Sequence, residues 1–83
     1  MTTLENQIRH WLHKKDEKNA THMLVVCDTF DYIDYPIYAT SKEEAELLYE
    51  QYNDAESMSI VMEVYNLSMD IEQQLNEMVV LNF

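Results

Sequence analysis

The chain has 83 residues and a net charge of −11, from 16 acidic and 5 basic side chains. This excess of negative charge disfavours nucleic acid and anionic membranes as partners, and the absence of glycine excludes glycine-rich phosphate-binding loops. Hydrophobic residues make up 47% of the sequence, which favours a folded core over disorder. We therefore expect one domain over residues 1–83, with no cofactor, no direct nucleic-acid binding and no membrane attachment.

Cysteine content and apolar runs indicate the compartment. The one cysteine, Cys27, cannot form a disulfide within the chain, which favours a reducing environment. Residues 1–15 lack the basic-then-apolar layout of a secretion signal, and no apolar run approaches the roughly 18 residues that span a bilayer. These features predict a cytoplasmic protein.

The first predicted element is an amphipathic helix over about residues 3–15. Ile8 and Trp11 belong to an apolar stripe whose members recur at helical spacing. We expect this helix to pack on an α+β body formed by residues 21–83, or to be exchanged with another copy of the chain. In the second case Ile8 and Trp11 would form the interface of a homodimer.

Hydrophobic periodicity predicts four strands and two further helices in the rest of the chain. HMLVVCD is apolar on both faces, as expected of a central strand, whereas SMSIVMEVY alternates as a strand with two different faces does. Ser41 and Glu44 have the spacing of a capping box, which marks the start of a helix. The strands are expected at 22–28, 35–39, 57–65 and 78–83, and the helices at about 42–52 and from Ser68 through Leu75.

These elements predict an α+β fold with the order α-β-β-α-β-α-β. We expect a small, mostly antiparallel sheet of about four strands, with helices on one side. Pro36 has no backbone N–H to donate, so its strand should start there or lie at an edge of the sheet.

No catalytic constellation stands out, and we expect a protein that is not an enzyme. His10 and His13 lie three residues apart on the first helix, but a metal site needs further ligands and no Cys or His cluster follows. An alternative is a metal-binding protein or metal-dependent enzyme that holds Ca²⁺ or Mg²⁺ with Asp28, Asp31 and Asp34. Their spacing differs from that of an EF-hand loop, and the central glycine is missing.

The stretch CDTFDYIDYPIYAT, residues 27–40, combines acidic and aromatic side chains and contains no basic residue. Aromatic residues are enriched at the energetic centres of protein interfaces, and carboxylates accept paired hydrogen bonds from arginine. We therefore expect a partner-binding surface in this stretch. Its contact residues are predicted to be Asp28, Asp31, Tyr32, Asp34 and Tyr35.

The charge is unevenly distributed along the chain. Residues 1–20 contain four basic and three acidic side chains, whereas residues 21–83 contain one basic and 13 acidic. Glu43, Glu46 and Glu50 recur at helical spacing and should extend the acidic surface on the exposed face of the second helix. The expected partner is a basic protein surface, of the kind that nucleic-acid-binding proteins carry.

Residues 27–40 and 61–77 (VMEVYNLSMDIEQQLNE) resemble segments of short, acidic, uncharacterised proteins of phage-associated genomes. In its size, acidity and lack of glycine the chain is also similar to phage-encoded inhibitors of host nucleases and other defence proteins, some of which mimic DNA. The resemblance implies an inhibitor of the anti-CRISPR or anti-restriction type, acting in the host cytoplasm. The alternative from another class is a small structural or assembly homo-oligomer whose acidity serves solubility.

Overall fold

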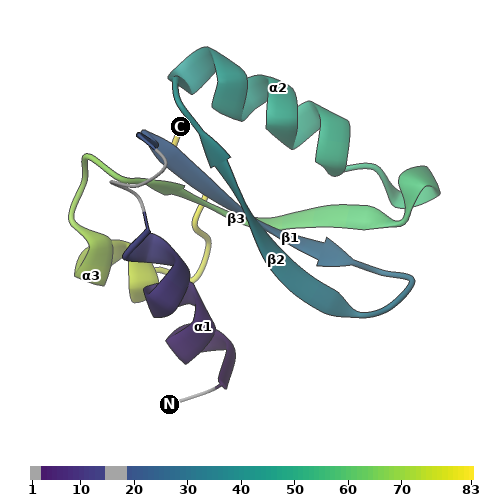
Figure 1. Ribbon diagram of the computed structural model, residues 1–83, viewed down its shortest axis with the longest axis horizontal. Helices are drawn as coiled ribbons and strands as arrows, with labels where there is room; N and C mark the ends of the chain where they lie inside the picture. Colours follow the sequence, from purple (N-terminus) through teal and green to yellow (C-terminus); the bar gives the residue numbers. More distant parts are fainter. Residues whose placement is uncertain (1–2, 15–18) are drawn as a thin grey trace.

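The computed structural model describes residues 3–14 and 19–83, and within these ranges three helices, a short 3-10 helix and three strands form an α+β fold (Figure 1). The prediction of this fold class is therefore confirmed. The elements, in chain order, are α1 (Thr3–Leu12), β1 (His22–Asp28), β2 (Ile33–Ala39), α2 (Lys42–Tyr52), η1 (Ala55–Ser57), β3 (Ser59–Asn66) and α3 (Ile71–Leu75).

The strands form one antiparallel sheet in the order β2-β1-β3, so β1 lies in the centre. Five consecutive residues of β1, from His22 to Val26, are buried. β2 is an edge strand, in which Pro36 lies opposite Val25. A proline is tolerated in an edge strand because the side of the strand that faces solvent needs no N–H donor for the sheet. The predicted edge position of Pro36 is therefore confirmed.

Helices cover both sides of the sheet, and the prediction of helices on one side is wrong. Met23 and Val25 pack in a core with residues of α1, whereas Leu24 and Val26 pack in a second core with residues of α2. Figure 1 shows α1 and α3 below the sheet and α2 above it. A central strand that is apolar on both faces has to be covered on both.

Each core draws on several elements. The core on the α1 and α3 side contains Ile8, Leu12, Met23, Val25, Tyr65, Leu67 and Val80. The core on the α2 side contains Leu24, Val26, Ala39, Ala45, Val61 and Val64.

Helix α2 starts at the predicted capping box. The Ser41 side chain accepts a hydrogen bond from the Glu44 N–H at 3.0 Å. The Glu44 carboxylate in turn accepts a hydrogen bond from the Thr40 N–H at 2.7 Å. Two backbone donors at the helix start are thereby satisfied, and the position of Lys42–Tyr52 agrees with the prediction.

A β-bulge in β3 changes which of its side chains are buried. Val25 of β1 pairs with Glu63, but the next residue, Val26, pairs with Val61, so Met62 has no partner across the strand pair. Because one extra residue shifts the alternation, Val61 and Val64 both enter the α2-side core. Met62 is left 42% exposed, although strict alternation would place it on the same face as Val64.

The C-terminal segment does not form the predicted strand at 78–83. It makes a single parallel bridge between Leu81 and Val64. The Val64 N–H donates to the Val80 carbonyl at 2.7 Å, and the Asn82 N–H donates to the Val64 carbonyl at 3.0 Å. The sheet of the described residues therefore has three strands instead of about four, and the final β of the predicted order is absent from it.

Gln74 of α3 joins the end of β3 to the C-terminal segment, and its side chain is 1% exposed. Its carbonyl oxygen accepts hydrogen bonds from the Asn66 N–H at 2.8 Å and the Asn82 side chain at 3.0 Å. Its amide nitrogen donates to the Asn66 carbonyl at 2.9 Å and the Asp70 carbonyl at 3.1 Å. Asp70, and not the predicted Ser68, caps α3.

We expect Gln74→Leu to lower the free energy of unfolding by about 2 kcal/mol, because the backbone groups of Asn66 lose their partners. Urea denaturation followed by circular dichroism measures the change. Gln73→Leu, on an exposed position of the same helix, is the matched control and should leave stability almost unchanged. Equal midpoints for the two variants would show that the Gln74 network does not stabilise the fold.

Candidate functional site

Two turns meet at the end of the sheet that lies away from α1. One turn joins β1 to β2, and the other joins η1 to β3. The Thr29 N–H of the first turn donates to the Met58 carbonyl of the second at 2.9 Å, which holds the two together. Four large apolar side chains, which we call the tip, surround this junction: Phe30, Tyr32, Ile33 and Met58.

The four apolar side chains of the tip are each at least half exposed. Phe30 is 70% exposed, Tyr32 83%, Ile33 58% and Met58 50%. Full burial of such side chains would stabilise a fold by roughly 1.5–3 kcal/mol each. Neighbouring exposed apolar side chains of this kind are typical of an interaction surface.

Two tip residues have strained backbone conformations. The φ angle is 56° at Tyr32 and 58° at Met58. This left-handed region costs a residue with a Cβ roughly 1–2 kcal/mol, and a chain without glycine has to accept that cost or use asparagine. At position 19, where φ is 51°, the chain has an asparagine. The tip instead places large apolar side chains at both strained positions.

The three aspartates of the predicted site do not converge. One carboxylate oxygen of Asp28 accepts hydrogen bonds from the Phe30 N–H at 2.8 Å and the Asp31 N–H at 3.2 Å, so Asp28 builds the turn. Asp31 is exposed on that turn, whereas Asp34 lies opposite Cys27 in the strand pair. Among residues 3–14 and 19–83, no three His, Cys, Asp or Glu side chains are placed to hold a metal ion.

Tyr32 and Tyr35, the two predicted tyrosines, have different surroundings. The Tyr32 side chain is exposed at the tip, whereas Tyr35 is half-buried and packs against the α2-side core. Burial raises the pKa of the Tyr35 hydroxyl, and Tyr52, Asp28 and Cys27 beside it act in the same direction.

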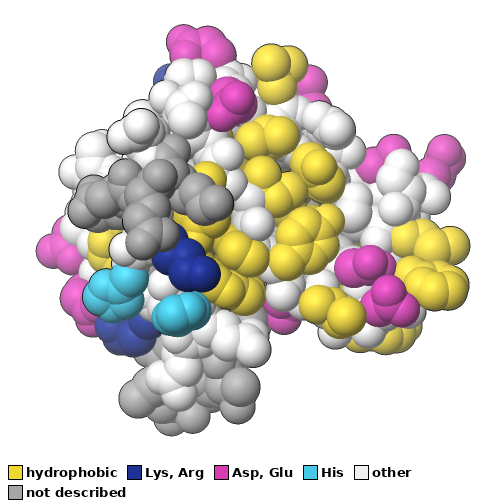
Figure 2. Space-filling view, viewed as in Figure 1, with side chains coloured by type: hydrophobic (Ala, Val, Ile, Leu, Met, Phe, Trp, Pro, Cys, Tyr) yellow, Lys and Arg dark blue, Asp and Glu magenta, His cyan; other side chains and the backbone are white. Residues whose placement is uncertain are grey.

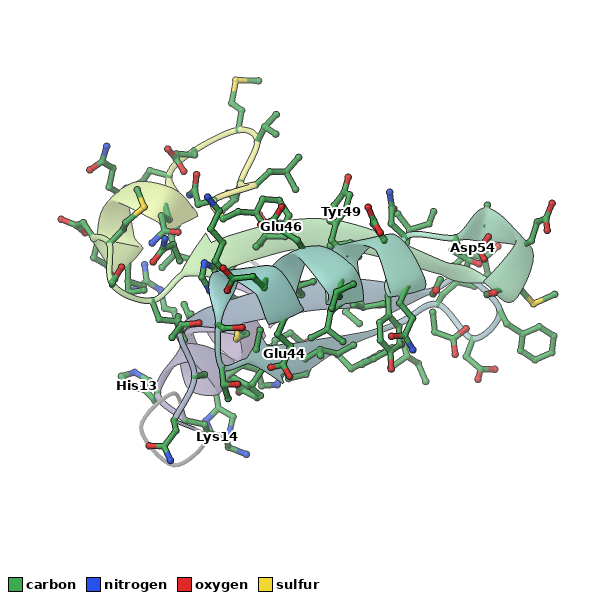
Figure 3. All side chains as sticks on the ribbon, turned by 90° about the horizontal axis from the view of Figure 1, so that it is seen from above. His13, Lys14, Glu44, Glu46, Tyr49 and Asp54 are labelled. Atoms are coloured by element: carbon green, nitrogen blue, oxygen red, sulfur yellow. The ribbon has the colours of Figure 1, made fainter. Side chains whose placement is uncertain are left out.

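The predicted acidic row of α2 lies on one exposed face. Glu43, Glu46 and Glu50 line a shallow hollow of about 220 Å³ with Leu47. Ala45 of the same helix is buried against the sheet. Figure 3 shows α2 lying across the sheet, with Glu46 and Tyr49 labelled along it.

Basic side chains gather at one end of the molecule, whereas acidic side chains are spread over several sides. Figure 2 shows acidic and hydrophobic side chains together at the right-hand end, where the tip lies, and basic and histidine side chains at the lower left over α1. In Figure 3, His13 and Lys14 lie at the opposite end from Asp54. Acidic residues outside the tip, such as Asp70, Glu72 and Glu77, are also exposed, so the negative surface is not confined to one side.

Helix α1 packs on the sheet of its own chain. Ile8 is 4% exposed in the core, and Trp11 packs against that core. The Tyr38 hydroxyl donates to the Trp11 carbonyl at 2.6 Å, which fixes the helix to β2. A dimer through Ile8 and Trp11 therefore requires exchange of α1 between chains, and it stays a prediction.

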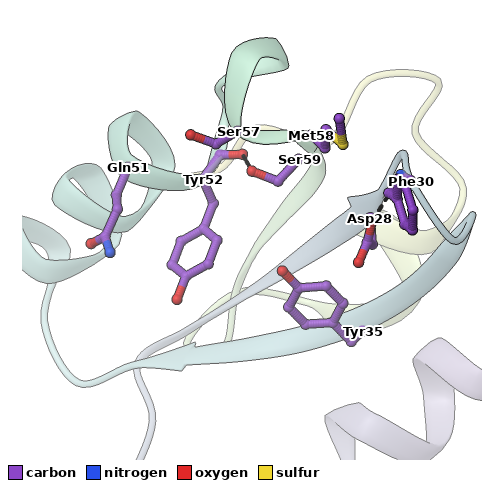
Figure 4. Close-up of a pocket in the computed structure, with 8 residues that line it drawn as sticks. All are labelled: Asp28, Phe30, Tyr35, Gln51, Tyr52, Ser57, Met58 and Ser59. Atoms are coloured by element: carbon purple, nitrogen blue, oxygen red, sulfur yellow. Dashed lines mark hydrogen bonds between the residues drawn. The ribbon is translucent and has the colours of Figure 1, made fainter.

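A hollow of about 450 Å³ opens beside the tip, between the end of α2 and the β1–β2 hairpin (Figure 4). We call it the tyrosine hollow. Its walls come from three separate parts of the sequence, which is why pattern analysis of single segments did not predict it. It is lined by Asp28, Phe30, Tyr35, Gln51, Tyr52, Ser57, Met58 and Ser59.

Comparisons with protein-family models, curated proteins and solved structures give no match to this chain. Among the helices of the described residues, none has the length and apolar character needed to cross a membrane.

We expect Tyr32→Asn to raise the free energy of unfolding by about 0.5–1 kcal/mol, because asparagine tolerates a positive φ better than tyrosine. Phe30→Asn is the control, since it removes an exposed aromatic side chain from the same turn at a position without positive φ. Thermal denaturation of the three proteins measures the difference. A Tyr32→Asn protein no more stable than Phe30→Asn would argue against strain at this turn.

We expect Cys27 to be alkylated by iodoacetamide more slowly at pH 8 than free cysteine. Burial, the hydrogen bond to Asp34 and the negative charges of Asp34 and Asp28 all raise the pKa of the Cys27 thiol, which leaves less thiolate. Asp34→Asn should lower that pKa and speed the reaction, whereas Asp31→Asn should have little effect. Identical pH–rate profiles for the three proteins would contradict this account.

Proposed function

We propose that the protein is a non-enzymatic binding module that engages a basic surface of a partner protein through its tip. The observation that carries the proposal is the combination of exposed apolar side chains with a strained backbone at Tyr32 and Met58. Strain of this kind persists where it serves a function, because a relaxed turn would stabilise the fold better. Contact with a partner would bury the apolar surface.

The acidic side chains around the tip support a basic partner. Asp31 and Asp34 belong to the hairpin, and Asp54 and Glu56 lie in or beside η1. No described Lys or Arg belongs to these segments. Carboxylates at the rim of an apolar patch attract a basic surface during approach and select its orientation.

A nucleic-acid-handling protein offers such a basic surface, because it has to neutralise phosphates. In the concrete form of the proposal, the partner is a host defence nuclease and the protein is a phage-encoded inhibitor of the anti-CRISPR or anti-restriction type, acting in the host cytoplasm. The module would block the nuclease sterically and electrostatically. The row formed by Glu43, Glu46 and Glu50 would add long-range attraction to the contacts of the tip.

We expect that removing two negative charges beside the tip, those of Asp31 and Asp34, weakens the complex more than removing two negative charges from α2. The partner is first captured from a native host lysate at low salt, eluted at high salt and purified. Asp31→Asn combined with Asp34→Asn should then lower its affinity at least tenfold, or about 1.4 kcal/mol, and flatten the salt dependence. Glu43→Gln combined with Glu46→Gln removes the same charge and should mainly slow association.

Equal losses for the two double variants would show that total charge, and not the tip, determines binding. A captured partner whose affinity does not depend on salt would contradict the electrostatic part of the proposal. Retention of full affinity in Phe30→Ser and Tyr32→Ser variants would remove the apolar tip from the interface.

A further inference from the structure

The tyrosine hollow combines one carboxylate with aromatic walls. Asp28, at the end of β1, and Tyr35, on β2, face it from the sheet, and Tyr52 faces it from the last turn of α2. Figure 4 shows the Asp28 carboxylate and the Tyr35 hydroxyl directed toward the same space, with the Tyr52 ring on the other side of it. The Ser59 hydroxyl closes one wall by donating to the Tyr52 carbonyl.

Three polar atoms around this hollow have no hydrogen-bond partner in the described part of the chain. One carboxylate oxygen of Asp28 holds the turn through Phe30 and Asp31, and the second oxygen is unused. The hydroxyl groups of Tyr35 and Tyr52 form no hydrogen bond with any described residue either. All three can therefore accept hydrogen bonds from a ligand that enters the hollow.

The electrostatic environment of the hollow favours a cation. Its eight lining residues include the Asp28 carboxylate and no basic side chain. Of the described cations, Arg9 and Lys14 belong to α1 and its end, and Lys42 begins α2 at the end opposite Tyr52. Burial raises the pKa of the Tyr35 hydroxyl, and the charge of Asp28 adds to this, so the hydroxyl stays neutral beside the carboxylate.

We propose that the tyrosine hollow receives one arginine side chain of the basic partner, with Asp28 as its counter-ion and Tyr35 and Tyr52 as its walls. This inference rests on the proposed function and names the group that the module recognises. A guanidinium is flat, stacks on aromatic rings and presents several donors in a fixed plane, which matches a carboxylate oxygen and two hydroxyl acceptors. An ammonium group lacks the flat face, and an anion would be repelled by Asp28.

The test uses the full chain and a small probe, so that it does not depend on the identity of the partner. N-acetyl-arginine methylamide is titrated into ¹⁵N-labelled protein, and amide chemical shifts are followed by NMR. We expect saturable shifts at Phe30, Met58 and Ser59. The matched lysine compound should bind more weakly, and the citrulline compound, which has nearly the same shape without the charge, at least tenfold more weakly.

Asp28→Asn is the decisive variant, because asparagine keeps the oxygen that holds the turn and removes the negative charge. We expect it to lower the affinity for the arginine probe at least tenfold. Glu77→Gln is the matched control, since it removes one charge from an exposed carboxylate outside the lining of the hollow, and it should change affinity less than twofold. Unchanged amide shifts elsewhere in the spectrum would show that both variants are folded.

Each outcome decides between the hollow and the wider proposal. Shifts spread over α2 and α3, equal binding of citrulline, or full affinity in Asp28→Asn would overturn the arginine site. If the affinity for the captured partner still depends on Asp31 and Asp34 in that case, the proposed function stands without the arginine site. Saturable arginine binding at the hollow without any tip-dependent partner would support the site and contradict the proposed function.

Discussion

The structure depends on the burial of both faces of β1. Met23 and Val25 point to one side of this strand, and Leu24 and Val26 to the other, so neither face can be left in water. Two small cores result, one under α1 and α3 and one under α2. In a chain of this length each core is small, and each needs every covering element to remain in place. The buried Gln74 network serves this need, because it fixes α3 and the C-terminal segment to β3.

The same arrangement leaves one end of the sheet uncovered on the side that α1 and α3 occupy (Figure 1). Helix α1 and Tyr38 interact near one end of the strands, whereas the β1–β2 turn and η1 meet at the other. Apolar side chains at that end have no core to enter, which explains the exposure of Phe30 and Met58. The tyrosine hollow is a consequence of the same geometry, because the end of α2 stands over the hairpin and leaves a space between them (Figure 4).

Local patterns predicted most elements of this fold, and long-range pairing explains what they missed. The double-sided strand at 22–28 and the capping box before α2 followed from side-chain type and spacing alone. The bulge at Met62 did not, because it is set by how β3 pairs with β1. Composition predicted a binding surface in the stretch that contains Asp28 and Tyr32. It could not show that Asp28 holds a turn or that residues of α2 and η1 lie beside it.

The hydrogen bond between Thr29 and Met58 couples two turns that contribute nothing to either core. Substitutions at the exposed positions of these turns can therefore accumulate without unfolding the molecule, provided that the junction is kept. Under the proposed function, Phe30 and Tyr32 would contact the partner without serving either core, whereas Asp28 would both hold the turn and bind the partner. Under the same proposal, these exposed positions would let a lineage follow a changing target by diversifying a few side chains, and the coupled turns would make the chain a compact scaffold for displaying pairs of short loops.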